Sequence, residues 1–127
     1  MQSQVNYSTV YYYEILYSKN QGNQYVVFKL GTLYGQYKND LDKSIFYLEK
    51  SISLNSNDVI TLTNLGVAYG IQKRYDKSVN VLEAAYKIDP NSLNIINNLA
   101  LTYKLLGNKE KAQYFDNRAI ALKNKKK

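Results

Sequence analysis

The side chains that most often carry chemistry in proteins are scarce in this chain of 127 residues. Histidine and cysteine are absent, so the commonest general base, the thiol nucleophile and the usual zinc ligands are missing. The acidic pair Asp40 and Asp42 lacks the glycine and the glutamate of a calcium loop, and capping of a helix is the simpler interpretation. We therefore expect no cofactor, no metal site and no enzymatic activity.

Fourteen tyrosines are the other chemically distinctive feature. Aromatic rings near basic side chains could stack on single-stranded nucleic acid. However, Tyr34, Tyr69 and Tyr103 recur at regular spacing, which favours a place in the core. The net charge of +7 is concentrated at the end, where Lys123 and Lys125–Lys127 provide four of the seventeen basic residues. Sequence-specific recognition of bases depends largely on bidentate hydrogen bonds from arginine to the base edges. Because only two arginines are present, we expect no sequence-specific nucleic-acid binding.

The composition predicts a folded protein, since 45% of the residues are hydrophobic and 13% are aromatic. No apolar run is long enough to span a bilayer. The first residues carry no basic side chain before their apolar part, unlike a secretory signal. Together with the absence of cysteine, this favours a cytoplasmic location, with a previously removed signal sequence as the alternative.

An internal repeat of 34 or 35 residues is the strongest pattern. Leu30, Leu65 and Leu99 are each followed by a small residue and then, three positions later, by a tyrosine. Small residues form three columns of this repeat, and the second and third columns have a spacing of 34 residues throughout. The columns are Gly31, Gly66 and Ala100, then Ser44, Ser78 and Ala112, then Ser51, Ala85 and Ala119. The first copy has one extra residue, most simply at Lys38–Asn39. Each copy is predicted to form two antiparallel helices that approach closely at the small residues.

The stretch from Asn64 to Pro90 resembles a tetratricopeptide repeat. Gly66, Tyr69, Tyr75, Ser78, Ala85 and Pro90 fall on signature positions of that family, with serine at residue 78 in place of the usual alanine. The resemblance implies an all-α fold, a right-handed superhelical array of antiparallel helix pairs made of three repeats, at 24–58, 59–92 and 93–126. Asn57–Asp58 and Asn91–Ser92 are expected to cap the helices that follow them.

The tyrosine-rich segment 1–23 precedes these repeats. Thr9, Tyr13, Leu16 and Tyr17 fall in phase with the second helix of a repeat, so we expect an additional N-terminal capping helix at about residues 8–20. A disordered arm is the alternative interpretation.

The resemblance also implies a concave groove lined by the first helix of each pair. Gly35 and Gly70 are expected to open this groove, to pack on a neighbouring helix, or simply to be tolerated in the helix. Lys104 is expected to make the C-terminal end of the groove cationic. Asn64 and Asn98 stand where an asparagine of the family often holds a ligand's backbone. The expected groove residues are Tyr25, Phe28, Thr32, Ile60, Thr63, Asn64, Val67, Ile71, Asn94, Asn97, Asn98, Leu101, Lys104 and Leu105.

Three functions fit this pattern. The first is a protein-binding adaptor whose groove takes an apolar segment of a partner, with or without an acidic end. The second is a homo-oligomeric scaffold that covers the same surface with further copies. The third is a weak, non-specific binder of nucleic acid or of an anionic surface through the lysine tail.

Deletion of Asn124–Lys127 tests the third function. Any binding to nucleic acid should depend little on sequence and should be lost with salt, because it would rest on lysine–phosphate contacts. Gel-shift titration should therefore show most of the binding removed by the deletion. Sequence-selective binding that persists at about 0.2 M salt would contradict this expectation.

Overall fold

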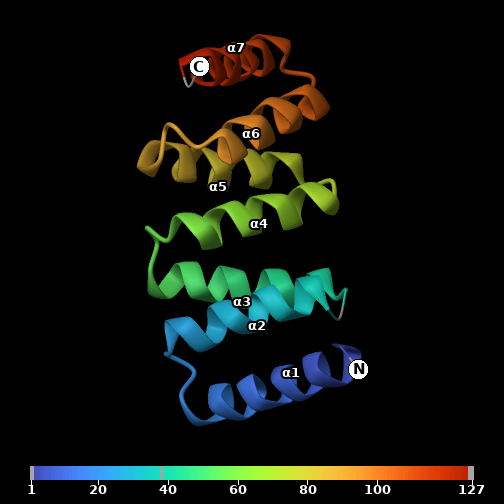
Figure 1. Ribbon diagram of the computed structural model, residues 1–127. Helices are drawn as coiled ribbons and strands as arrows, with labels where there is room; N and C mark the ends of the chain where they lie inside the picture. Colours follow the sequence, from blue (N-terminus) through green and yellow to red (C-terminus); the bar gives the residue numbers. More distant parts are fainter. Residues whose placement is uncertain (1, 38, 126–127) are drawn as a thin grey trace. The chain divides into compact units, whose positions relative to one another are not determined.

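The computed structural model describes residues 2–37 and 39–125, and within them it contains seven α-helices and no strand (Figure 1). The predicted all-α fold is therefore confirmed. Met1, Lys38 and residues 126–127 lie outside the described residues. Met1 begins the predicted segment 1–23, and Lys38 is part of the predicted insertion. Residues 126–127 belong to the ends of the third repeat and of the basic tail. The chain divides into two compact units between Asn64 and Leu65.

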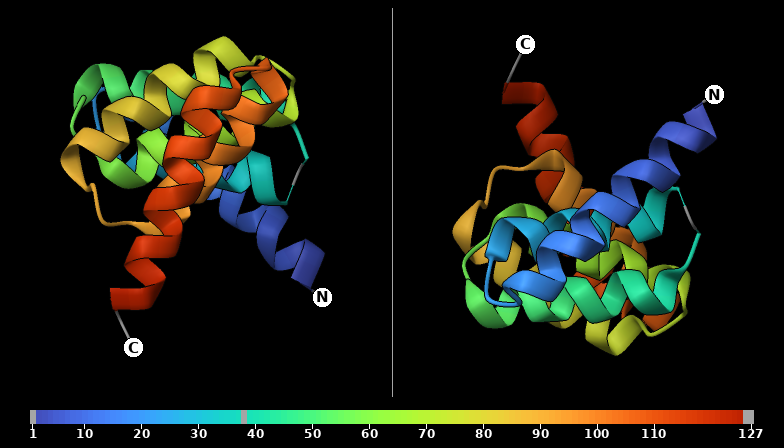
Figure 2. Two further views of the ribbon diagram at one scale, coloured as in Figure 1. Left: turned by 90° about the horizontal axis from the view of Figure 1, so that it is seen from above. Right: turned by 90° about the horizontal axis from the view of Figure 1, so that it is seen from below.

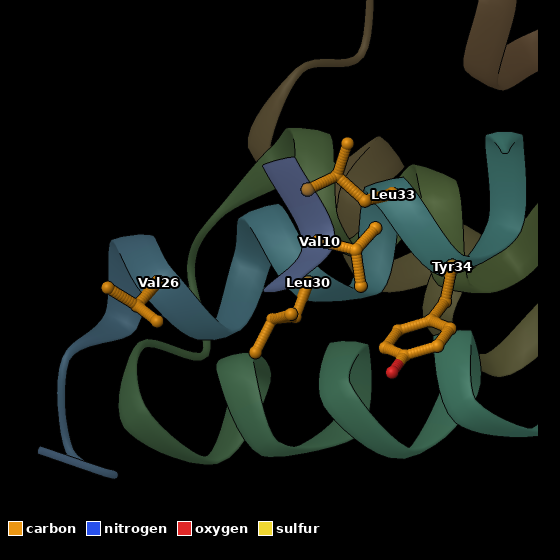
Figure 3. Close-up of a cluster of buried hydrophobic side chains, with 5 residues drawn as sticks. All are labelled: Val10, Val26, Leu30, Leu33 and Tyr34. Carbon is orange, nitrogen blue, oxygen red and sulfur yellow. The ribbon is translucent and has the colours of Figure 1, made fainter. Parts of the chain in front are cut away.

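The first unit holds α1 (Gln2–Lys19), α2 (Gln24–Gln36), α3 (Leu41–Leu54) and the beginning of α4 (Val59–Ile71). The helix α1 starts six residues earlier than the predicted residue 8, and the alternative of a disordered arm is wrong for Gln2–Lys19. Val10 of α1 packs into an apolar cluster with side chains of α2 (Figure 3), namely Val26, Leu30, Leu33 and Tyr34. Tyr13, Leu16 and Tyr17 pack against the same cluster, as expected for the second helix of a repeat.

The second unit holds the rest of α4 together with α5 (Tyr75–Ile88), α6 (Leu93–Leu106) and α7 (Lys109–Lys125). The helices α6 and α7 lie beside each other across the short turn that joins them, as the left view in Figure 2 shows. The helix α5 packs on α6 as α1 packs on α2. Each predicted repeat thus contains one helix pair, while the repeat boundaries themselves stay a prediction. No helix among the described residues is both long and apolar enough to cross a membrane.

A close helix crossing holds each of the first two pairs together. A Cβ atom added to Gly31 would lie 2.7 Å from Leu48, and one added to Gly66 would lie 2.6 Å from Leu82, so neither position has room for a side chain. The hydroxyl of Ser44 donates to the carbonyl oxygen of Gly31, and that of Ser78 to the carbonyl oxygen of Gly66, both at 2.7 Å. This hydrogen bond accounts for serine at residue 78, where the family usually has alanine.

Local hydrogen bonds set where the helices begin. The side chain of Asp40 accepts from the backbone N–H of Lys43 at 3.1 Å, so its predicted role as a cap is confirmed. Asp58 accepts from the N–H groups of Ile60 and Thr61, and Ser92 caps α6 in the same way. These bonds satisfy backbone donors that the first helical turn leaves without partners.

The turn within each helix pair contains one residue in the left-handed conformation. These residues are Asn39 (φ 51°), Lys73 (φ 63°) and Gly107 (φ 84°), and they are spaced by 34. The N–H of Arg74 donates to the carbonyl oxygen of Tyr69, five residues back, whereas the N–H of Asp40 reaches Tyr34, six residues back. The additional residue of the first repeat is therefore accommodated between Tyr34 and Asp40.

Lys73 and Gly107 provide a matched test of this turn. A left-handed conformation costs a residue with a Cβ about 1–2 kcal/mol, while glycine costs backbone entropy of about 0.5–1 kcal/mol. We expect Lys73→Gly to stabilise the fold by ~0.5 kcal/mol and Gly107→Ala to destabilise it by ~1 kcal/mol. A Cβ at Gly107 would meet no atom within 4 Å, so steric clash would not confuse the result. Denaturant unfolding should show midpoints shifted in opposite directions; shifts of the same sign would contradict this account.

Candidate partner-binding surface

The first helix of each pair buries one stripe of side chains and leaves the opposite stripe open. In α4 the buried stripe includes Leu62, Leu65 and Tyr69, and in α6 it includes Ile95 and Leu99. Because a helix repeats every 3.6 residues, the side chains about half a turn away from these must face outward. The groove residues predicted from the sequence lie mostly on this outward stripe.

In the first unit, the outward stripe combines apolar and polar groups. Tyr25 and Ile60 are 59% and 63% exposed, whereas Phe28, Thr32 and Asn64 are half-buried. The hydroxyl of Thr32 donates to the carbonyl oxygen of Phe28 at 3.0 Å, which leaves its methyl group as the more available contact.

In the second unit, the outward stripe is dominated by aliphatic side chains. On α4 these are Val67 and Ile71, of which Ile71 is 61% exposed; on α6 they are Leu101 and Leu105, both more than half exposed. The two pairs stand at equivalent positions, 34 residues apart. No charged side chain of α4 shields Val67 or Ile71, because that helix contains no charged residue, whereas α6 carries Lys104 next to Leu105.

Thr63 is an exception, because it does not lie on an open surface. Its side chain is buried, and its hydroxyl donates to the carbonyl oxygen of Val59 at 2.8 Å. Residue 63 lies at the edge between the buried and the outward stripe, where a neighbouring helix can cover a side chain. Its assignment as a groove residue was wrong.

The asparagines of α6 are partly engaged with each other. The amide nitrogen of Asn98 donates to the backbone carbonyl and to the side-chain oxygen of Asn94, at 2.9 and 3.0 Å. A ligand backbone that needs the Asn98 donor would therefore displace a bond within the helix. Asn97 is exposed, and Asn98 itself is half-buried.

Lys104 carries the cation expected at the C-terminal end of the groove. Its ammonium lies 3.1 Å from a carboxylate oxygen of Asp116 on α7. The two side chains are accessible to solvent, so this ion pair adds little to stability, but it offsets the local positive charge. The surface near Lys104 is thus closer to neutral than the sequence suggested.

The prediction that Gly35 and Gly70 open the groove was wrong, and close packing on a neighbouring helix accounts for the glycine only at residue 35. A Cβ added to Gly35 would lie 3.0 Å from the hydroxyl oxygen of Ser44, and one added to Gly70 would lie 3.7 Å from that of Ser78. Both glycines therefore face the second helix of their own pair. Gly70 lies four residues after Gly66 and shares its face.

The predicted core tyrosines Tyr34, Tyr69 and Tyr103 are confirmed as buried, so they are not a platform for stacked bases. The hydroxyl of Tyr103 donates to a carboxylate oxygen of Glu83 on the preceding helix at 3.0 Å, and Tyr34 bonds with Glu14 in the same way. The residues covering the rings were not predicted: Lys43 lies over Tyr34, Lys77 over Tyr69 and Lys111 over Tyr103. Their spacing of 34 residues was the signal that could have found them.

This packing changes the ionisation of the buried hydroxyls. Burial, followed by the hydrogen bond to Glu83, raises the pKa of Tyr103 from 10.0 to about 12. Burial and the bond to Glu14 raise the pKa of Tyr34 in the same direction. Both shifts arise because a tyrosinate would lose solvent and would face a carboxylate.

Comparison with known sequences locates the repeats independently. Models described as tetratricopeptide repeat match residues 25–58 and 58–125. The search of curated proteins finds no match.

Comparison with solved structures identifies similar folds. MamA AMB-1 is 23% identical with a TM-score of 0.85, covering 91% of this chain and 62% of that chain. MamA MSR-1 is 21% identical with a TM-score of 0.87, covering 99% and 72%. YrrB, described as a TPR protein with an unusual peptide-binding site, is 21% identical with a TM-score of 0.85, covering 94% and 61%. The chain thus spans about three fifths of the length of MamA AMB-1 and YrrB, and at this identity the likeness shows the fold alone.

The raised pKa of Tyr103 predicts loss of stability at alkaline pH. A folded-state pKa above the ordinary value means that its stabilisation is complete below pH 10.0 and is lost as the pH rises toward about 12. Thermal unfolding followed by circular dichroism should show a melting temperature that falls across this window. Tyr103→Phe should reduce that dependence, because it removes one titrating hydroxyl. A variant with the full wild-type dependence would show that other groups cause it.

Proposed function

Because the chain belongs to the tetratricopeptide-repeat family, whose members are protein–protein interaction modules, we propose that it binds an apolar segment of a partner protein through the outward stripes of α4 and α6. No catalytic family is indicated by any match. The observation that supports this proposal is the exposure of aliphatic side chains on the first helices of the pairs. The surface residues that carry it are Ile60, Val67, Ile71, Leu101 and Leu105.

Exposed aliphatic side chains at regular helical spacing favour contact with apolar groups. Ile60, Val67 and Ile71 follow one another on α4 at intervals of seven and four residues, which places them on a single stripe. Burial of such an uncharged stripe against a partner stabilises the complex by roughly 25 cal/mol for each Å² of apolar surface removed from water. After the cost of ordering the partner, micromolar affinity is the expected range.

The chemistry of the partner follows from the groups beside the stripe. Asn94 and Asn97 provide polar contacts for a backbone, and the aliphatic residues take its apolar side chains. An acidic end on the partner would have to compete with Asp116 for Lys104. We therefore propose an apolar segment as the primary ligand, with an acidic end as a secondary preference.

Self-association is the second candidate, and α1 provides the observation that favours it. Tyr11 and Tyr12 on that helix are 66% and 58% exposed, and Ile15 is also exposed. Aromatic rings of this kind are common anchors in protein interfaces. Sedimentation across a range of concentrations distinguishes this candidate, because a scaffold must grow in mass with concentration.

A double substitution tests the adaptor function. Peptides selected from a random library against the chain should be apolar, and Val67→Glu with Ile71→Glu should weaken their binding at least tenfold, about 1.4 kcal/mol. Both side chains are exposed, so helicity and melting temperature should change little. Isothermal titration calorimetry gives the affinities.

Ile88→Glu with Ile120→Glu provides the matched control, since these side chains are also exposed but lie on the second helices, α5 and α7. This control should bind the peptide as the wild type does. Equal loss in both double variants, or no loss in the first, would exclude the outward stripe of α4 as the binding surface.

A further inference from the structure

The second unit contains a cavity that lies apart from the outward stripes, between α5 and α7. Its volume is about 360 Å³. It is lined by aromatic rings and charged side chains, namely Glu83, Tyr86, Glu110, Lys111, Tyr114 and Phe115. Both of its walls belong to second helices of repeats, whereas the proposed peptide surface lies on first helices.

Three aromatic rings form the apolar part of this cavity. The ring of Phe115 is buried and meets Tyr86 edge to face, with centroids 5.2 Å apart and an interplanar angle of 88°. Tyr114 meets Phe115 at 5.0 Å and 90°, and its own ring is 52% exposed. Phe115 therefore serves as the floor. The exposed Tyr114 and the half-buried Tyr86, whose side chains hydrogen-bond to each other, form the walls.

The charged side chains that line the cavity, Glu83, Glu110 and Lys111, have a net negative charge, while Arg118 acts on Tyr114 from outside the lining. The ammonium of Lys111 lies 5.2 Å over the ring of Tyr103 and 3.5 Å from its hydroxyl, so it is directed toward α6. One oxygen of Glu83 accepts the hydrogen bond of Tyr103. Glu110 is exposed and has no ion-pair partner within the described part of the chain. Two carboxylates and one engaged lysine leave the cavity suited to a cation.

The first unit repeats this combination of residues between α1 and α3. The corresponding positions lie 68 or 69 residues earlier and hold the same classes of side chain: Glu14, Tyr17, Asp42, Lys43, Phe46 and Tyr47. The ring geometry also repeats, with Tyr17 and Tyr47 at 5.3 Å and 89°, and Phe46 and Tyr47 at 5.2 Å and 81°. The middle repeat has Asn80 and Val81 in place of the last two aromatics.

A cation of the chain itself lies at this place in the first unit. The ammonium of Lys50 is 5.9 Å from the centroid of the Tyr17 ring. The residue equivalent to Lys50 in the second unit is Arg118, and its guanidinium instead donates to the carbonyl oxygen of Pro90 and the side-chain oxygen of Asn91. Among the described residues, no lysine or arginine lies over the ring of Tyr86.

We propose that the cavity between α5 and α7 binds the guanidinium group of an arginine side chain from a partner protein. Tyrosine faces attract cations, and the planar, weakly hydrated guanidinium stacks on aromatic rings more readily than an ammonium. Glu110 supplies a carboxylate that can accept two parallel hydrogen bonds from it. The volume of the cavity accommodates one such side chain.

Titration of the full chain with blocked arginine, acetyl-arginine amide, tests this proposal by NMR. Signals of Tyr86 and Tyr114 should shift with a dissociation constant on the order of a millimolar, as expected for a few weak contacts. The neutral isostere acetyl-citrulline amide should bind roughly two- to fivefold more weakly, which is the contribution of an exposed cation–π contact. Equal binding of the two compounds, or no shift with either, would overturn the proposal.

Four variants locate the binding site. Tyr114→Leu and Glu110→Gln should each weaken arginine binding, whereas Lys111→Gln should strengthen it by removing a like charge. Melting curves identify any variant that is merely unfolded. Val67→Glu with Ile71→Glu should leave arginine binding unchanged, so failure of the peptide surface and failure of this cavity are distinguishable. Arginine binding that survives both Tyr114→Leu and Glu110→Gln would overturn the proposal.

Discussion

The closest approach of the two helices in a pair is the constraint on which the rest of the structure depends. At Gly31 and at Gly66, the second helix lies so near that a single methyl group would clash with a leucine. A hydroxyl of the second helix then bonds to the carbonyl oxygen of that same glycine, so the backbone of one helix is fastened to a side chain of the other. The third repeat has Ala100 and Ala112 at the corresponding places and no such hydrogen bond is present there. This approach commits one face of each first helix and thereby determines which residues remain for a partner.

A second type of contact joins the first pair and the third pair to the helix before each of them. In both units a tyrosine of the first helix bonds to a glutamate of the preceding helix and stacks on an aromatic ring of its own second helix. In the first unit the stacked rings are Tyr34 and Tyr47, and in the second they are Tyr103 and Phe115. Phe115 is also the floor of the cavity between α5 and α7, so one side chain both supports the fold and shapes a potential binding site.

Much of the fold could be predicted from the sequence, because each column of the repeat corresponds to one contact within a helix pair. Gly31, Leu30 and Ser44 are conspicuous only because their counterparts recur 34 or 35 residues later. Caps such as Asp58 and Ser92 were predictable because they depend on neighbours within three residues. These features are local or periodic, and both kinds of information are present in a single chain.

The edges of the candidate site were less predictable. Thr63 is buried and Gly70 faces the second helix of its pair, and helical spacing alone did not decide which neighbour covers either residue. The ion pair of Lys104 with Asp116 joins two helices and has no periodic signal. The aromatic groups around Phe115 combine residues from three helices, so their contacts depend on tertiary packing rather than on spacing within any one helix.

The absence of charge on α4 affects how readily the chain associates with copies of itself before it folds. Val59–Ile71 is the only helix among the described residues without a charged side chain, and it is rich in β-branched and aliphatic residues. Segments of this kind pair readily with copies of themselves while a chain is still being synthesised or is transiently open. Asp58 directly precedes the segment, and Lys73 and Arg74 follow it after Gln72. Charges that flank an apolar segment oppose aggregation without reducing the apolar character of the segment itself.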